Sequence, residues 1–392
     1  MHPADRIRGN RGNRFNSARI ILCVTGSIAA TETVKLARQL IRYGAEVVPV
    51  MTREAAEILN PAALHFASGR YPVLELTGDV EHISLLSTER CAVIVAPATA
   101  NVISKIANGI ADDAVTTLCL NAVGMRIPVI VAPAMGASML TNQFLEENMR
   151  RLRRHGIELL PSIMEEEEAK LLDANFITES ALRSLSKGLL ARRNVLVIGG
   201  ASEEAIDDVR FISSRSSGAT AVEIAIAAYE QRAVVTMWCG RMEVSVPPFI
   251  KSVRFRSVRE AIELASGKKF DIVIVPASLS DFIPKKRKGK IASDSDLSLE
   301  LESAPKLLDA LRDKCRVLVG FKAEVAGEKE LLERARKRFE ASRLDMIVAN
   351  RLQDVSSSTT KAFIITKQGE EPYEGEKRGL AERIIELVAG LK

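Results

Sequence analysis

Small polar residues follow three predicted strands at their carboxyl ends. Thr99 and Asn101 follow one apolar run, Thr52 follows a second, and Gly26 and Ser27 follow a third. In an open α/β sheet, ligands lie outside the carboxyl ends of the strands. Hydroxyl groups and the backbone N–H groups of a helix start favour a phosphate there. The alternative is a set of ordinary polar turns. The absence of a G-x-G-x-x-G fingerprint favours a mononucleotide over a dinucleotide.

A second group of chemistry-bearing residues lies in the C-terminal half. Asp281 follows the predicted strand 272–275, and the run 285–290 carries five cations in six positions. Lysine and arginine bind phosphate oxygens, and a carboxylate can hold a base, a ribose or Mg²⁺. The arrangement is suited to a nucleoside triphosphate, although many basic runs are simply solvated.

His82, within the sequence Glu-His-Ile, is one of four histidines in the chain. Histidine can transfer protons near neutral pH, which makes it a candidate general acid or base. A lone histidine is more often structural, so this position by itself indicates no reaction.

The elements that must position these residues alternate between strands and helices. Strand 19–25, helix 28–43 and strand 47–51 predict a right-handed parallel crossover. A second start follows with strand 194–198 and helix 219–231. We therefore expect an α/β fold with two doubly wound Rossmann-like domains. The expected division is a disordered basic tail over 1–18, a first domain over 19–187 and a second domain over 188–392.

Composition narrows the class of protein. The 392 residues are 47% hydrophobic and 27% charged, without an apolar run long enough to suggest a membrane span. The net charge is +5, but the first 19 residues hold five arginines against one aspartate, so about one positive charge remains for the rest. No nucleic-acid or membrane partner is expected. Five widely spaced cysteines fit reduced thiols in a cytoplasmic protein.

Nine short motifs occur in order along the two halves. They are TGSIAA (25–30), EHI (81–83), APATAN (96–101), PAM (133–135), VRFISSRSSG (209–218), SDF (280–282), GKI (289–291), GFKAE (320–324) and LDMIVAN (344–350). On these motifs the chain resembles the bifunctional coenzyme A biosynthesis family, in which a phosphopantothenoylcysteine decarboxylase is fused to a phosphopantothenate–cysteine ligase. The resemblance extends from about residue 19 to the end.

For the first half, the resemblance implies a decarboxylase that binds FMN between subunits, usually of a trimer. It makes His82 the catalytic histidine and Met139 a substrate contact. In this chemistry the flavin oxidises the thiol side of 4′-phosphopantothenoylcysteine, so that loss of CO₂ has an electron acceptor; the product is 4′-phosphopantetheine. The implied flavin contacts are Gly26, Ser27, Thr52, Thr99, Ala100, Asn101, Val102 and Ala134.

For the second half, the resemblance implies condensation of 4′-phosphopantothenate with cysteine, using CTP (ATP in the eukaryotic type of the family) and Mg²⁺. The substrate carboxylate attacks the α-phosphate of CTP, and the resulting acyl-cytidylate reacts with the cysteine amine. Ser214 and Lys290 take catalytic positions, and Arg210 takes a substrate-binding position. The implied nucleotide contacts are Ala277, Asp281, Lys290, Phe321 and Arg338. The ligase half implies a dimer, which with the trimer allows a dodecamer.

Several positions depart from the family pattern. Gly136 stands where the family has a substrate-binding Asn, and Leu140 replaces a Trp. Ser214 replaces the Asn that stabilises the acyl-cytidylate, and Ala219 replaces a Lys. The segment 161–174, where many bacterial members carry a reducing cysteine, contains no Cys.

These departures motivate an alternative, namely a flavin-binding regulatory or assembly homologue with one or both activities impaired. A flavin prenyltransferase-like protein is a third reading of the first half, which the fused ligase-like half argues against.

Overall fold

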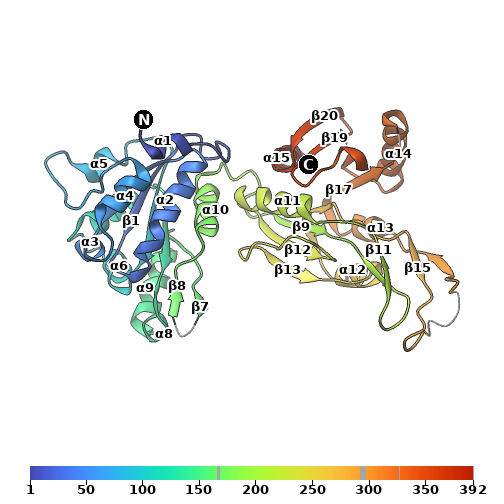
Figure 1. Ribbon diagram of the computed structural model, residues 1–392, viewed down its shortest axis with the longest axis horizontal. Coiled ribbons are helices and arrows are strands. Elements are labelled where there is room, and N and C mark those ends of the chain that lie inside the picture. Colours follow the sequence, from blue (N-terminus) through green and yellow to red (C-terminus); the bar gives the residue numbers. More distant parts are fainter. Residues whose placement is uncertain (166–167, 292–296, 326, 392) are drawn as a thin grey trace. The chain divides into compact units, whose positions relative to one another are not determined.

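The chain forms two compact units, Met1–Ser186 and Lys187–Lys392 (Figure 1). A computed structural model describes residues 1–165, 168–291, 297–325 and 327–391. The division lies one residue before the expected boundary.

Unit 1 is built on a five-stranded parallel sheet with the strand order β2-β1-β3-β4-β6. The strands are β1 (Arg19–Val24), β2 (Glu46–Met51), β3 (Cys91–Ala98), β4 (Val129–Pro133) and β6 (Glu158–Leu159). A small sheet joins β5 (Met135–Gly136), β8 (Glu168–Lys170) and β7 (Ile163–Glu165). In the large sheet β2 lies on one side of β1, and β3, β4 and β6 follow on the other side. The switch point therefore lies between β1 and β3, which is where such sheets bind ligands.

Helices cover both faces of this sheet because its central strands are apolar on both sides. The helical segments are α1 (Pro3–Ile7), η1 (Ile28–Glu32), α2 (Thr33–Arg42), α3 (Arg53–Ile58), α4 (Pro61–Ser68), α5 (Glu81–Ser84), α6 (Ala100–Ala107), α7 (Ala114–Gly124), α8 (Ala137–Leu140), α9 (Gln143–Arg154) and α10 (Ala174–Leu185). Ile21 and Cys23 on β1 pack in one core with Val102 on α6 and Leu118 on α7. The predicted helix 28–43 begins as the 3₁₀ turn η1 before it becomes α2.

The expected disordered tail over residues 1–18 is wrong. Helix α1 packs against α2 and α4, and Ala4 and Phe15 are fully buried. Two arginines of this segment are also hydrogen-bonded: Arg8 donates to the Ala45 carbonyl at 2.5 Å, and Arg14 forms a bidentate hydrogen bond with Glu179. Apolar burial and these contacts order a segment whose charge suggested disorder.

Unit 2 is built on an eight-stranded sheet with the order β13-β12-β9-β14-β17-β18-β19-β20. The strands are β9 (Asn194–Gly199), β12 (Val234–Cys239), β13 (Lys251–Arg254), β14 (Phe270–Val275), β17 (Cys315–Glu324), β18 (Met346–Arg351), β19 (Thr359–Thr366) and β20 (Gly369–Glu376). From β13 to β18 all pairs are parallel, and β19 and β20 pair antiparallel. The parallel part has the Rossmann strand order, with its switch point between β9 and β14. Two doubly wound α/β units are therefore confirmed, the second with an antiparallel extension.

The helices of unit 2 lie in two layers. They are α11 (Ala219–Glu230), α12 (Val258–Leu264), α13 (Leu307–Arg312), α14 (Glu328–Ala341) and α15 (Lys377–Gly390), with a 3₁₀ turn η2 (Leu352–Asp354). Buried residues of α11 and α15 share one core with the sheet, and those of α12, α13 and α14 share another.

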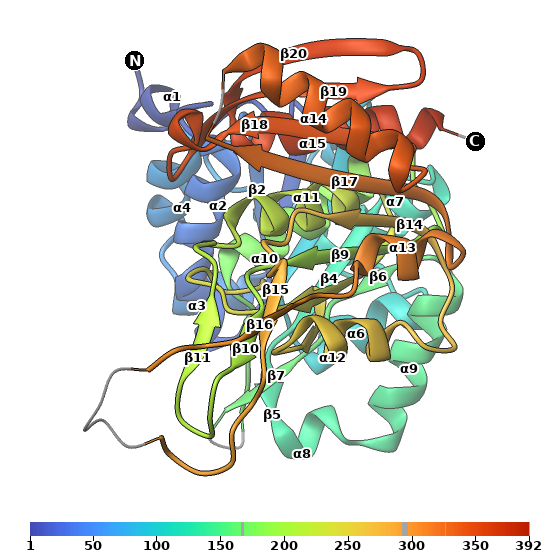
Figure 2. The ribbon, with the colours of Figure 1, turned by 90° about the vertical axis from the view of Figure 1, so that its right-hand side faces the viewer.

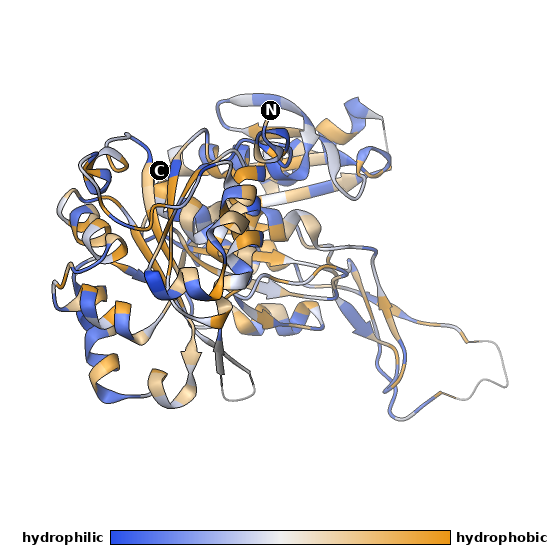
Figure 3. Cartoon of the chain, turned by 60° about the vertical axis from the view of Figure 1, so that its left-hand side comes forward, coloured by the Kyte–Doolittle hydropathy of each residue, from blue (hydrophilic) through white to orange (hydrophobic). Residues whose placement is uncertain are grey.

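Two antiparallel hairpin-like pairs form what we name the arm of unit 2. The arm comprises β10 (Glu203–Ala205) with β11 (Phe211–Ser213) and β15 (Phe282–Pro284) with β16 (Leu301–Ser303). Figure 2 shows these strands and their loops extending away from the large sheet. Figure 3 shows hydrophobic stretches along the arm.

Candidate functional site

The carboxyl ends of β1 and β3 in unit 1 are tied together by the buried Thr25 hydroxyl. This hydroxyl donates to the Pro97 carbonyl at 2.7 Å and accepts from the Thr99 N–H at 3.1 Å. The Ala134 N–H at the end of β4 donates to the Ala98 carbonyl at 3.1 Å. The switch point is thus a fixed edge formed by three adjacent strands.

Three helical segments begin at this edge, each capped by a predicted site residue. Ser27 accepts from the Ala29 N–H at the start of η1. Thr52 and Thr99 cap α3 and α6 in the same way. The capping hydroxyls satisfy one N–H each, and the remaining N–H groups of each first turn can bind an anion. Asn101, on the first turn of α6, is exposed, whereas the Val102 side chain is buried in the core and only its backbone faces this edge.

Gly26 leaves room at the same edge. A Cβ at this position would lie 2.6 Å from the Glu54 Cβ, so no other residue fits without movement of α3. Hydrogen bonds from the Glu54 backbone and from Thr52 hold the pKa of the Glu54 carboxyl below its ordinary value. With the capped helix starts, this small-residue cradle fits a flavin phosphate.

Within one chain, His82 lies near the amino ends of the strands, whereas the residues above lie at the carboxyl ends. It belongs to α5, and the Leu85 carbonyl, at the C-cap of that helix, accepts a hydrogen bond from Arg19 at 3.3 Å. Arg19 is the first residue of β1, so α5 lies near the amino ends of the strands. Figure 1 shows α5 toward the end of unit 1 where α1 lies, and α3 and α6 toward the other end. The structure therefore does not bring His82 to the edge where Asn101 lies.

The His82 side chain is half-buried, and its Nδ1 is buried without a hydrogen-bond partner among the described residues. Its backbone is fixed, because Asn121 on α7 donates to the His82 carbonyl at 2.5 Å.

The segment after β4 carries the other predicted substrate contact. Met139 on α8 is 53% exposed, and Gly136 at the start of this helix is also exposed. Leu140, at the position of the family Trp, packs on the unit 1 core. Met139 is therefore available to a ligand, while Leu140 acts as a packing residue.

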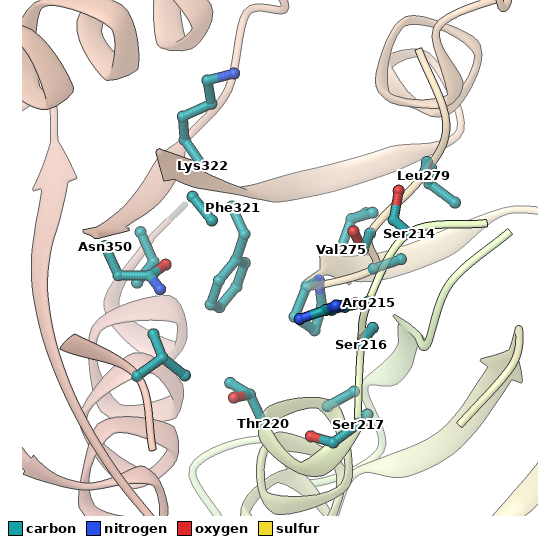
Figure 4. A pocket seen from close by; sticks show the side chains of 18 of the residues that line it. Ser214, Arg215, Ser216, Ser217, Thr220, Val275, Leu279, Phe321, Lys322 and Asn350 are labelled. Atoms are coloured by element: carbon teal, nitrogen blue, oxygen red, sulfur yellow. The ribbon is translucent and has the colours of Figure 1, made fainter. Parts of the chain in front are cut away.

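Unit 2 contains a large cavity of about 1140 Å³ at the carboxyl ends of its strands, which we name the unit 2 pocket. Its walls come from the loop before α11, the ends of β14, β17 and β18, and the starts of β19 and α15. The Phe321 ring lies near the middle of the view in Figure 4, with Arg215 on one side and Asn350 on the other. The position of the unit 2 pocket at the switch point of the sheet is typical of a nucleotide site.

Four of the five predicted nucleotide contacts line this pocket, and so does Ser214. These four residues are Ala277, Asp281, Phe321 and Arg338. The Asp281 carboxylate forms an ion pair with the Lys306 ammonium at 2.5 Å. That hydrogen bond, with the nearby charges of Lys306, Lys322 and Arg338, holds the pKa of Asp281 below its ordinary value.

Lys290 and Arg210 are not among the residues that line the unit 2 pocket. Arg210 is bonded within the arm, to the Asp207 carboxylate and to the Ile291 carbonyl, both at 3.1 Å. The side chain of Lys290 is exposed on the same arm. Asp207 fixes this region by accepting from the N–H groups of Val209, Arg210 and Ile291, and these hydrogen bonds lower its pKa to about 2.

The pocket also contains cationic and polar residues that the sequence did not single out. These are Arg215, Lys306, Asn350, Thr360 and Lys377. Arg215 and Asn350 could have been found, since each lies in a matched motif and Asn350 ends a predicted apolar strand. Lys306, Thr360 and Lys377 have no such local signal.

Two observations bear on metals and membranes. Across the described ranges, no group of three or more His, Cys, Asp and Glu side chains converges as a metal site. Among the same residues, every helix is too short or too polar to cross a membrane.

The two units match two family models. Residues 9–186 match the family described as Flavoprotein, and residues 190–391 match the DNA/pantothenate metabolism flavoprotein C-terminal domain. The Coenzyme A biosynthesis bifunctional protein CoaBC of Thermococcus kodakarensis is 38% identical, over 98% of this chain and 98% of that protein. The protein of the same name from Methanocaldococcus jannaschii is 37% identical, over 100% and 98%.

A solved structure of the C-terminal domain of a CoaBC protein is 25% identical, covering 52% of this chain and 97% of that one, with a TM-score of 0.43. On the two models and the full-length relatives, the chain belongs to the family of coenzyme A biosynthesis bifunctional proteins.

Proposed function

We propose that the chain catalyses two consecutive steps of coenzyme A biosynthesis. Unit 2 condenses 4′-phosphopantothenate with cysteine, and unit 1 decarboxylates the product to 4′-phosphopantetheine. The observation that carries the proposal is the similarity of both units, in one chain, to bifunctional relatives over nearly the full length. No finding favours a regulatory homologue without activity. The free cysteines are consistent with a cytoplasmic location.

In unit 1, the edge at the switch point would hold FMN. The backbone N–H groups of the helix starts after Ser27, Thr52 and Thr99 would bind the phosphate. Gly26 and Ala134 would allow the flavin to approach the backbone closely. When bound, FMN supplies a two-electron acceptor for the cysteine thiol side of the substrate. In this proposal Asn101 donates hydrogen bonds to the flavin at the same edge.

The decarboxylase site is completed by a neighbouring subunit in this proposal. Its support is the separation of His82 from the edge where Asn101 lies. One copy presents its strand edge, and another presents α5 with its His82 and the exposed Val80 and Ile83. The unpartnered Nδ1 of His82 is then free to hold or donate a proton at the substrate. A trimer is the simplest closed ring of such heterologous contacts.

In unit 2, the carboxylate of 4′-phosphopantothenate attacks the α-phosphate of CTP and releases pyrophosphate. The cysteine amine then attacks the acyl carbon of the acyl-cytidylate, which forms the amide and releases CMP. Lys306 and Arg338 screen the triphosphate charge that would repel the carboxylate. The Ser214 hydroxyl donates a hydrogen bond to the intermediate, and Mg²⁺ enters with the triphosphate, because Mg²⁺ is commonly held by substrate phosphates and few carboxylates.

The arm supports a dimer of unit 2. Its exposed apolar side chains include Phe211, Phe282 and Leu301, at 43%, 56% and 47% exposure. Pairing of two arms would bury these side chains. It would also offer Lys290 to the partner's pocket, since Lys290 does not line its own. A trimer through unit 1 and a dimer through unit 2 together allow a dodecamer.

The test is a reconstitution with the purified full-length chain. Incubation with 4′-phosphopantothenate, cysteine, CTP and Mg²⁺ should yield 4′-phosphopantetheine, CMP, pyrophosphate and CO₂, and the preparation should release FMN on denaturation. Accumulation of 4′-phosphopantothenoylcysteine would confine activity to unit 2. Absence of both products would favour the regulatory homologue.

A further inference from the structure

His82 belongs to a helix that has little anchorage of its own in the unit 1 core. Helix α5 has four residues, and none of them is buried. Val80, the residue before it, has φ 48° and ψ 50°, in the left-handed region that β-branched side chains rarely adopt. Such backbone strain persists only where the surrounding contacts hold it in place. The position of His82 therefore depends on bonds that reach α5 from other parts of the chain.

The loop before α5 is closed by Glu81. Its carboxylate accepts hydrogen bonds from the Thr77 N–H at 2.8 Å and from the Thr77 hydroxyl at 2.6 Å. These bonds lower the pKa of the Glu81 carboxyl, so the carboxylate is ionised at neutral pH. The clamp joins α5 only to its own loop, so it does not fix His82 relative to the sheet.

The bond that ties the His82 backbone to the rest of unit 1 comes from Asn121. The last carbonyls of a helix lack partners within the helix. In the described part of the chain no backbone N–H donates to the His82 carbonyl, because the Leu85 and Leu86 N–H groups donate to other carbonyls. The Asn121 side-chain amide satisfies this carbonyl at 2.5 Å.

Helix α7, which carries Asn121, is a firm support for this bond. Its start is fixed by a capping box, in which the Asp113 carboxylate accepts from the Thr116 N–H at 2.8 Å. Leu118 and its neighbours on α7 are buried in the unit 1 core. Arg19 also holds α5, but it bonds the Leu85 carbonyl, at the longer distance of 3.3 Å. Asn121 acts on the residue that carries the imidazole.

We propose that Asn121 is a positioning residue for His82 in the decarboxylase reaction. The inference rests on the proposed function of unit 1 and adds a residue to it. Asn121 touches neither substrate nor flavin in this scheme, and holds the backbone from which the imidazole projects. Because both residues lie in one chain, Asn121 serves the site that its own His82 completes on a neighbouring copy.

The first test compares the kinetics of Asn121→Ala and Asn108→Ala on supplied 4′-phosphopantothenoylcysteine. Asn108 is exposed at the end of α6, and its amide donates to the Ser104 carbonyl at 2.9 Å. The control therefore loses a bond of the same kind away from His82. Alanine favours a helix, so α7 should persist in Asn121→Ala.

Asn121→Ala should lower kcat about tenfold or more, because a catalytic group displaced by a fraction of an ångström loses much of its effect. KM should stay within about twofold, and flavin absorbance per chain should not change. Asn108→Ala should resemble the unaltered chain. An unchanged kcat, or a loss of flavin that accounts for the slower reaction, would overturn the assignment.

The second test asks which half of the shared site Asn121 serves. Variants are unfolded, mixed in pairs and refolded together. Asn121→Ala mixed with Asn101→Ala should recover activity, since one chain then supplies an intact strand edge and the other an intact, well-positioned His82. Asn121→Ala mixed with His82→Ala should not recover. Recovery in the second mixture, or the same result in both, would overturn the proposal.

Failure of the proposed function gives a different result. If the unaltered chain does not decarboxylate supplied 4′-phosphopantothenoylcysteine, the function of unit 1 itself is wrong. If His82→Ala and Asn101→Ala do not complement each other, the shared site is wrong, and the comparison of kcat with KM still decides the role of Asn121.

Discussion

The Asp281 carboxylate and the Lys306 ammonium form an ion pair at 2.5 Å on the wall of the unit 2 pocket. The pair links the loop after β14 to the residue before α13. The hydrogen bond from Lys306 lowers the pKa of the Asp281 carboxyl, so the carboxylate is ionised at neutral pH and holds Lys306 in place. The amount of positive charge available to a triphosphate at this wall therefore depends on Asp281.

Asp281→Asn should weaken CTP binding and lower ligase kcat/KM about tenfold or more, because a charged hydrogen bond and the position of Lys306 are lost. Decarboxylation of supplied 4′-phosphopantothenoylcysteine should not change. Asp313→Asn is the matched control, since Asp313 pairs with Arg343 on the surface at 3.2 Å. An unaltered CTP dissociation constant in Asp281→Asn would contradict the assignment.

Gly26→Ala should reduce the flavin content of the purified protein. The added methyl group would lie 2.6 Å from the Glu54 Cβ, so α3 must shift at the edge that binds the phosphate. Flavin absorbance per chain measures the effect. The double variant Gly26→Ala with Glu54→Gly removes the clashing atom and should recover flavin. Gly124→Ala, at a position with nothing within 4 Å of the new methyl group, serves as the control. Full flavin loading in Gly26→Ala would show that the edge is not used.

Variants of His82 and Asn101 should complement each other. His82→Ala and Asn101→Ala are each expected to lose decarboxylase activity. When the two are unfolded, mixed and refolded together, some sites receive an intact His82 from one chain and an intact Asn101 from another. Recovery of activity in the mixture, but not in either variant refolded alone, is the expected result. A mixture as inactive as its parts would mean that one chain supplies both residues.

Asp207 should make the stability of the arm depend on pH. Its pKa is about 2 in the folded chain, below the ordinary value of about 3.9. The ionised carboxylate therefore stabilises the fold at pH values above about 4, and this contribution is lost as the pH falls toward 2. Unfolding measurements on the unaltered chain and on Asp207→Asn should differ at pH 6 and converge at the acid end. A difference independent of pH would exclude this origin.

Local patterns in the sequence determine much of the fold. The apolar runs that become β1, β3 and β9 are predicted correctly, because a strand covered on both faces must be apolar throughout. The polar residues that follow these strands lie at the carboxyl ends of the sheet, because chain direction in a parallel crossover fixes which end of the strand they occupy. The division into two α/β units also follows from the order of strands and helices.

Only the tertiary structure decides which distant residues meet. It orders residues 1–18 by burying Phe15, it places His82 at the edge of the sheet opposite to Asn101, and it bonds Arg210 into the arm. Lys377 shows the physical reason most clearly. In the sequence it is one of many lysines, and it becomes a nearly buried residue on the wall of the unit 2 pocket only because α15 packs beside strands and loops far away in the chain. Burial and missing partners are properties of the packed fold, and no local spacing of residues encodes them.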